Sequence, residues 1–149
     1  MEKEKSKIAF ACDHAGYEAK EMLIGYLEEK ECYEIKDFGT WSLDSCDYPD
    51  FAHPMAKAVE NNEFDFGISL CGSGNGINMV VNKYAGIRSA LCWNVEIARL
   101  ARQHNDANVC AIPARFVSFV DAIDILEAFL NTKFEGGRHT GRVNKIAIH

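Results

Sequence analysis

Residues 66–76 read Phe-Gly-Ile-Ser-Leu-Cys-Gly-Ser-Gly-Asn-Gly, an apolar segment followed by a loop with glycine at every second position. The apolar segment predicts a buried strand, and Cys71 stands where this strand ends. Glycine has no Cβ, so the backbone N–H groups of such a loop can converge on an anion. A thiol beside an anion-binding loop predicts proton-transfer or nucleophile chemistry on a negatively charged substrate.

Strands and helices alternate on both sides of this stretch. Besides 66–70, we expect strands at 7–11, 33–36, 87–92 and 109–112. Helices are expected from Asp13 or His14 to about residue 30, at 49–61, from 76, at 94–104 and at 117–130, with Pro54 breaking the second helix or delaying its start. This alternation predicts an α/β fold, with a mostly parallel five-stranded sheet covered by helices on both faces. With no repeat or linker, we expect a single domain over residues 1–149.

The composition excludes several classes of protein. A net charge of −6 argues against general binding to nucleic acid or to a membrane surface. The charged N-terminal residues 1–5 are unlike a signal peptide, and no apolar run approaches the ~20 residues of a membrane span. The six cysteines form no CxxC pair and no zinc-ligand spacing, which is typical of a reducing compartment. We therefore expect a soluble cytoplasmic protein.

Cys71 could be an ordinary buried thiol that only packs in the core. The glycine loop that follows it favours a functional role instead. Ser73 and the loop amides could lower the pKa of the thiol and stabilise an oxyanion. The loop lacks the Gly-Lys-Ser/Thr ending of a nucleotide-binding P-loop. A cysteine phosphatase would place arginine six residues after the thiol, where this chain has Ile77.

Two further groups contain histidine. Asp13 and His14 follow the first strand, where Asp13 could cap a helix or both could reach a polar ligand. His104 stands near the end of a helix, either as a surface histidine stabilised by the helix dipole or as a proton carrier. Because ligands of parallel sheets bind at the carboxyl ends of the strands, we expect Asp13, His14, Cys71 and His104 to converge at one edge.

Two arginines near the C-terminus form a fourth group. Arg138 and Arg142 are four residues apart, so on a helix they share a face. They could be a solvated basic patch or a clamp for a phosphate group. Gly136 and Gly137 predict a bend before them, and Arg115, after the fifth strand, could join the clamp.

Taken together and in order, these motifs resemble one family. From Lys7 to about Ile146, the chain is similar to type B ribose-5-phosphate isomerases, a group that also includes galactose-6-phosphate isomerase. The motifs that carry the resemblance are ACDHAG at 11–16, GT at 39–40, DYP at 47–49, CGSGNG at 71–76, NK at 82–83, GIR at 86–88, RQHND at 102–106 and FEGGRH at 134–139.

The resemblance implies an aldose–ketose isomerase of the pentose phosphate pathway that works through an enediolate, without metal or cofactor. Cys71 would move the proton between C1 and C2; members with a glutamate base place it where this chain has Ile77. Ser73, often Thr in the family, would hold the oxyanion with the backbone around Gly72, Gly74, Asn75 and Gly76. His104, helped by Asp13, would open the furanose ring. The phosphate would be bound by His14, Arg115, Arg138 and Arg142. Tyr48 and Asn105 would line the sugar pocket.

The resemblance also implies a Rossmann-like three-layer sandwich and an active site shared between two subunits of a homodimer, or of a dimer of dimers. The C-terminal segment 132–149 would then reach the partner subunit. Two alternatives stay open from the sequence: the same chemistry on a hexose 6-phosphate such as allose or galactose 6-phosphate, and a sugar-phosphate-binding protein without catalysis. The presence of two candidate proton carriers, Cys71 and His104, argues against the second.

Overall fold

The centre of the molecule is a five-stranded, fully parallel sheet with the strand order β2-β1-β3-β5-β4. It is seen in a computed structural model that describes residues 4–148, so residues 1–3 of the charged N-terminal segment lie outside it. The strands are β1 (Ser6–Cys12), β2 (Tyr33–Asp37), β3 (Phe66–Cys71), β4 (Ser89–Leu91) and β5 (Val109–Pro113). The predicted α/β fold is confirmed.

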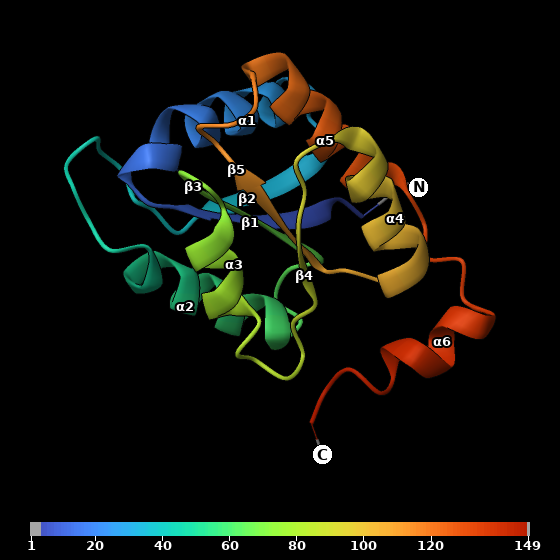
Figure 1. Ribbon diagram of the computed structural model, residues 1–149. Coiled ribbons are helices and arrows are strands. Elements are labelled where there is room, and N and C mark those ends of the chain that lie inside the picture. Colours follow the sequence, from blue (N-terminus) through green and yellow to red (C-terminus); the bar gives the residue numbers. More distant parts are fainter. Residues whose placement is uncertain (1–3, 149) are drawn as a thin grey trace.

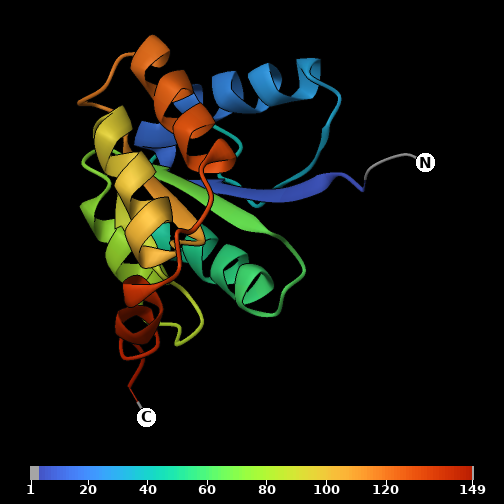
Figure 2. The same ribbon diagram turned by 90° about the vertical axis from the view of Figure 1, so that its right-hand side faces the viewer.

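Helices cover both faces of the sheet and make three layers (Figures 1 and 2). One face is covered by α1 (Tyr17–Glu29), α4 (Val95–Asn105) and α5 (Phe119–Asn131), and the other by α2 (Tyr48–Glu60) and α3 (Asn75–Val81). A short 3-10 turn, His14–Gly16, precedes α1, and α6 (Arg138–Val143) lies near the C-terminus. Within residues 4–148, no helix is both long and apolar enough to cross a bilayer.

Side-chain size differs between the two faces of the central strand β1. Ile8 and Phe10 point into the core beneath α1 and α5, whereas Ala9 and Ala11 point toward α2. Successive residues of a strand face opposite sides, so this alternation assigns one core to each face. The small side chains of β1 let α2 pack closely, with Ala52 and Ala56 fully buried.

Three element boundaries differ from the sequence-based predictions. The helix α2 runs through Pro54 without a break, because burial of its apolar face against the sheet outweighs the lost backbone hydrogen bond. Asp13 caps the 3-10 turn, accepting from the N–H groups of Ala15 and Gly16, so α1 begins only at Tyr17. The strand predicted at 87–92 is shorter, since the Arg88 N–H donates to the Asn108 side chain instead of to the sheet.

The chain reverses its direction of winding between β1 and β3. From β1 it passes to β2 on one side, and from β3 it continues toward β5 and β4 on the other. At such a switch point the loops after the two strands diverge and leave a crevice at their carboxyl ends. Asp13 follows β1 and Cys71 ends β3, so both lie at this crevice.

A buried lysine ties α1 to the end of β2. Lys20 is fully buried, and its ammonium group pairs with Asp37 and, at 3.2 Å, with Glu21. The second carboxylate oxygen of Asp37 accepts a hydrogen bond from the Gly39 N–H at 2.8 Å. This chain of contacts therefore fixes the path of the loop that leaves β2.

We expect Asp37→Asn to lower the free energy of unfolding by about 2–3 kcal/mol, because it leaves a buried ammonium without its main counter-charge. The matched control is Glu21→Gln, which removes a half-exposed carboxylate from the same ammonium group and should change stability by less than about 0.5 kcal/mol. Urea denaturation measures both. Equal effects of the two substitutions would contradict the assignment of Asp37 as the main partner.

Candidate active site

Cys71 is the last residue of β3 and points toward α2 and α3. It is 4% exposed, and its neighbours in this core include Ile77 and Val81 of α3. Its carbonyl accepts a hydrogen bond from the Ala114 N–H at 3.0 Å, and the Gly72 carbonyl accepts one from the Arg115 N–H at 3.0 Å. The ends of β3 and β5 are thereby held together directly behind the thiol.

The glycines after Cys71 are required by conformation and by close packing. Gly74 has φ +77°, in the left-handed region, and a Cβ there would stand 2.5 Å from Leu91. A Cβ on Gly76 would stand 2.6 Å from the Tyr48 hydroxyl, so the start of α3 and this ring are in contact. Ser73 Oγ accepts a hydrogen bond from the Asn75 N–H at 3.2 Å. The loop is thus compact and brings Tyr48 to the glycine backbone.

His14 has a defined hydrogen-bonding role. Its Nδ1 accepts a hydrogen bond from the backbone N–H of Cys46 at 3.2 Å. In the neutral ring the proton must therefore be on Nε2, which is free to donate to a ligand. Asp13 and His14 line a cavity of about 680 Å³ together with Tyr48 and its neighbours in residues 45–50.

Arg115 lies against the glycine loop. A Cβ on Gly72 would be 3.3 Å from Nη1 of Arg115, which places the guanidinium group beside this glycine. Ten of the predicted site residues therefore lie at the carboxyl edge of the sheet: Asp13, His14, Tyr48, Cys71, Gly72, Ser73, Gly74, Asn75, Gly76 and Arg115.

The other four predicted residues lie at the opposite, amino edge. His104 and Asn105 end α4, which runs antiparallel to the strands, and Arg138 and Arg142 are on α6 beyond that end (Figures 1 and 2). The length of β5, ~16 Å, separates the two edges. The prediction that His104 converges with Asp13, His14 and Cys71 at one edge is wrong, because the C-terminus of a covering helix returns to the amino edge. Asp13 consequently does not assist His104 within one chain.

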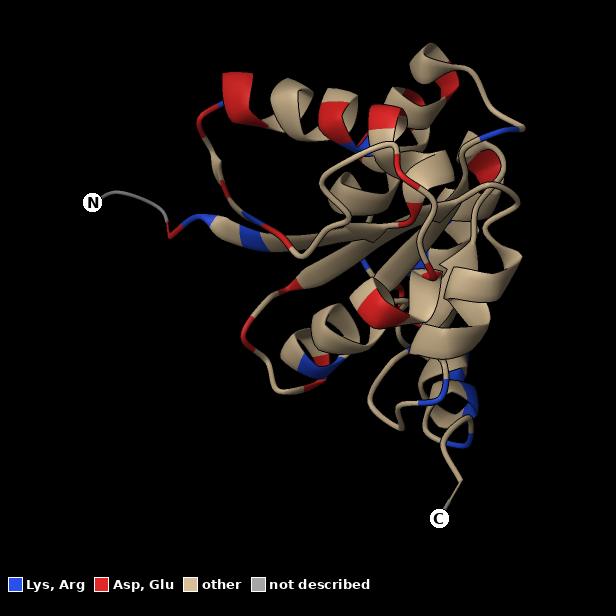
Figure 3. Cartoon of the chain, turned by 90° about the vertical axis from the view of Figure 1, so that its left-hand side faces the viewer, with Lys and Arg blue, Asp and Glu red and all other residues tan. Residues whose placement is uncertain are grey.

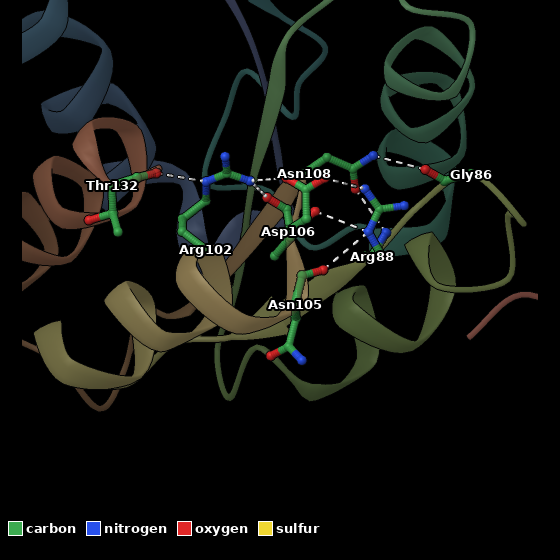
Figure 4. A network of polar contacts seen from close by, with 8 residues as sticks. Gly86, Arg88, Arg102, Asn105, Asp106, Asn108 and Thr132 are labelled. Atoms are coloured by element: carbon green, nitrogen blue, oxygen red, sulfur yellow. Dashed lines mark hydrogen bonds and ion pairs between the residues drawn. The ribbon is translucent and has the colours of Figure 1, made fainter. Parts of the chain in front are cut away.

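Two arginines that the sequence reasoning left without a role hold the end of α4 (Figure 4). Arg88 Nε donates to the carbonyls of Asn105 and Asp106 at 3.2 and 3.0 Å. Arg102 is buried, donates to Asp106, Ala107 and Thr132, and stacks near Phe66. Both arginines belong to motifs of the family resemblance, GIR at 86–88 and RQHND at 102–106, and these motifs were the sequence signal that could have identified them. The network fixes the turn that presents His104 and Asn105.

A histidine pair lies beside this turn. The ring of His104 stacks on that of His139 with 4.3 Å between centroids, and its Nε2 is 3.8 Å from a carboxylate oxygen of Glu135. Burial lowers the pKa of His139, and the positive charges of the neighbouring histidine and arginines lower it further. Among the described residues, His104, Glu135 and His139 are the one group of three whose ligand atoms could hold a metal ion, all within 4.8 Å of one another.

Positive charge is concentrated near the C-terminus. Figure 3 shows Lys and Arg gathered on the C-terminal segment, whereas Asp and Glu are frequent on the helices at the top of the view. The basic C-terminal segment therefore attracts anions in an otherwise acidic chain.

Burial raises the pKa of Cys12 to about 12, so that thiol stays protonated in the core.

Gly74→Ala should lower the free energy of unfolding by about 2 kcal/mol, since alanine is strained at a left-handed φ and its Cβ would overlap Leu91. Gly25→Ala is the matched control. Nothing lies within 4 Å of a Cβ at Gly25 on α1, so alanine should stabilise the protein by about 0.5–1 kcal/mol. Guanidinium titrations that show no loss of stability for Gly74→Ala would contradict the assigned backbone conformation.

Known proteins resemble this chain over nearly its whole length. The family model described as Ribose/Galactose Isomerase matches residues 8–146. Ribose-5-phosphate isomerase B of Escherichia coli K12 is 46% identical over 140 residues, which are 94% of this chain and 93% of that protein. A crystal structure of a ribose 5-phosphate isomerase from Thermotoga maritima has a TM-score of 0.94 at 46% identity, covering 97% of this chain and 99% of its own.

A second solved structure includes a ligand. Ribose-5-phosphate isomerase B from Mycoplasma genitalium, with bound ribulose-5-phosphate, is 41% identical and has a TM-score of 0.90, covering 94% of this chain and 93% of its own. Sequence, fold and the thiol at the switch point thus agree with the resemblance drawn from the motifs. The chain belongs to the ribose/galactose isomerase family.

Proposed function

We propose that this protein interconverts ribose 5-phosphate and ribulose 5-phosphate. The observation that carries the proposal is Cys71, which ends β3 at the switch point and leads into the glycine loop that contacts Tyr48. The relatives named above for this reaction, and the ribulose-5-phosphate bound to one of them, support the choice of a five-carbon sugar.

In this reaction Cys71 moves one proton between neighbouring carbons. The thiolate takes the proton from C2 of the open-chain aldose, and the negative charge passes to the C1 oxygen, which gives an enediolate. The proton of the C2 hydroxyl moves to the C1 oxygen, and the thiol returns its proton to C1. A carbonyl then stands at C2, which gives the ketose with no net oxidation. Ser73 and the backbone N–H groups of the glycine loop stabilise the oxygen on which negative charge develops.

The phosphate group binds away from the reacting carbons. His14 donates from Nε2, because the Cys46 N–H occupies its Nδ1, and Arg115 supplies a guanidinium group beside Gly72. Binding energy from this remote group positions the sugar over Cys71 and excludes water. Tyr48, in contact with the loop at Gly76, lines the space between the phosphate and the thiol.

A second copy of the chain completes the site. His104, Asn105, Arg138 and Arg142 lie too far from Cys71 to act on the same substrate within one chain. In a dimer with two-fold symmetry, the amino edge of each protomer meets the carboxyl edge of its partner, and two identical sites result. The partner's C-terminal segment 132–149 then brings Arg138 and Arg142 to the phosphate, while the partner's His104 opens the furanose ring.

Exposed apolar side chains support this assembly. Met79 on α3, Trp93 after β4 and Phe116 next to Arg115 are 65%, 54% and 76% exposed. Large apolar side chains gathered around a site are typical of a surface that a partner covers. All six cysteines are free, which fits a protein that works in the reducing cytoplasm.

Cys71→Ala should lower kcat for ribose 5-phosphate by about 10²–10⁴-fold, the usual contribution of a general base. Cys32→Ala removes an exposed thiol and should leave turnover unchanged. Both variants are compared by circular dichroism and by turnover of five- and six-carbon sugar phosphates. A folded Cys71→Ala protein with more than a tenth of the normal kcat would refute the proposed base, and a higher kcat/KM on a hexose 6-phosphate would refute the proposed substrate.

Sharing of the site between subunits predicts complementation. Cys71→Ala and His104→Asn proteins should each be inactive alone, but a dimer of one of each contains one intact site. After joint refolding of equal amounts, random pairing should restore about a quarter of the normal activity. If each site were built within one chain, the mixture would stay inactive, which would overturn the shared-site proposal.

A further inference from the structure

The histidine pair beside α6 has features of a ligand site that isomerisation leaves unexplained. His139 is 6% exposed, yet its Nε2 is buried without a hydrogen-bond partner. Buried polar atoms normally have partners, so such an atom requires an explanation. Glu135 and His104 offer a carboxylate oxygen and a ring nitrogen within 4.8 Å of a ring nitrogen of His139.

The backbone holds these three residues in place. The Glu135 N–H donates to the carbonyl of Gln103 on α4 at 3.0 Å, which fixes the loop against the helix end. Gly136 and Gly137 then have φ values of +69° and +58°, and this turn folds His139 back onto His104. The main chain therefore brings the three residues together, while the His104 ring and the Glu135 carboxylate are partly exposed.

We propose that His104, Glu135 and His139 form a binding site for a divalent transition metal ion such as Zn²⁺, and that the bound ion inhibits the enzyme by withholding His104 from the substrate. Two imidazoles and one carboxylate are a common zinc ligand set, with a fourth position left for water or an anion. The binding stands on its own, whereas the inhibition rests on the role proposed above for His104.

Metal binding requires a rotation of the His104 ring. The two rings are nearly parallel, at 14°, so their nitrogen lone pairs run side by side and do not yet converge. A tetrahedral zinc ion holds its ligand atoms about 3.4 Å apart. His104, whose side chain is 37% exposed, can rotate to meet the ion, while His139 stays fixed. Arg138 and Arg142 oppose a cation nearby, so we expect micromolar affinity and no structural requirement for the metal.

Calorimetric titration of the dialysed full-length protein with ZnCl₂ tests the binding. We expect one Zn²⁺ per chain, with affinity lowered about tenfold or more in both Glu135→Gln and His139→Gln. Glu63→Gln, at an exposed glutamate, is the matched control and should bind as the unmodified protein does. Unchanged affinity in both ligand variants, or no binding to the unmodified protein, would overturn the proposal.

Two further measurements separate this site from the thiol and from the mechanism. The Cys71→Ala protein should retain the Zn²⁺ affinity, and loss of binding in this variant would overturn the proposal. The Co²⁺ complex should have visible d–d bands without a thiolate charge-transfer band.

Zn²⁺ should inhibit turnover of the unmodified protein, with at least about tenfold more Zn²⁺ needed in His139→Gln. Binding without inhibition would support the metal site, overturn its inhibitory role and contradict the catalytic role of His104.

Discussion

In a fully parallel sheet, every strand ends at one edge and the helix that follows it ends at the other. This constraint decides the organisation of the protein. It places Cys71, the glycine loop, His14 and Arg115 at the carboxyl edge, and His104 with the two C-terminal arginines at the amino edge. Neither half suffices for the proposed reaction, so the topology itself favours catalysis by paired subunits.

The carboxyl-edge half depends on close approach between main chain and side chains. Gly16 packs against the Leu70 carbonyl so tightly that a Cβ would come within 2.7 Å of it, and Gly76 meets the Tyr48 ring in the same way. These contacts join the ends of β1 and β3 and the start of α2 and α3 into one small region. A loop held on so many sides needs little reorganisation when charge develops on a substrate oxygen.

The sequence predicted the strands, the order of the helices and the carboxyl-edge residues well, because apolar runs and glycine spacing are local signals. It failed where distant packing decides. Pro54 stays helical because α2 is pressed against the alanines of β1, and no local pattern reports that contact. His104 was expected beside Cys71 because the end of its helix was placed at the same edge as the strand ends, whereas α4 runs back and ends at the amino edge. The pairing of Arg88 and Arg102 with Asp106 needs the left-handed turn at Asp106, which becomes visible only once α4 and β5 are placed.

The hydrogen bond between the Cys46 N–H and Nδ1 of His14 has a consequence for how this site can vary. The group that selects the tautomer belongs to the main chain, so every residue at position 46 except proline supplies it equally. The path of the loop between β2 and α2 therefore fixes which ring nitrogen of neutral His14 holds the proton, and the side chains on that loop are free to diverge. Substitutions on this loop can alter the rim of the pocket, while neutral His14 keeps its proton on Nε2.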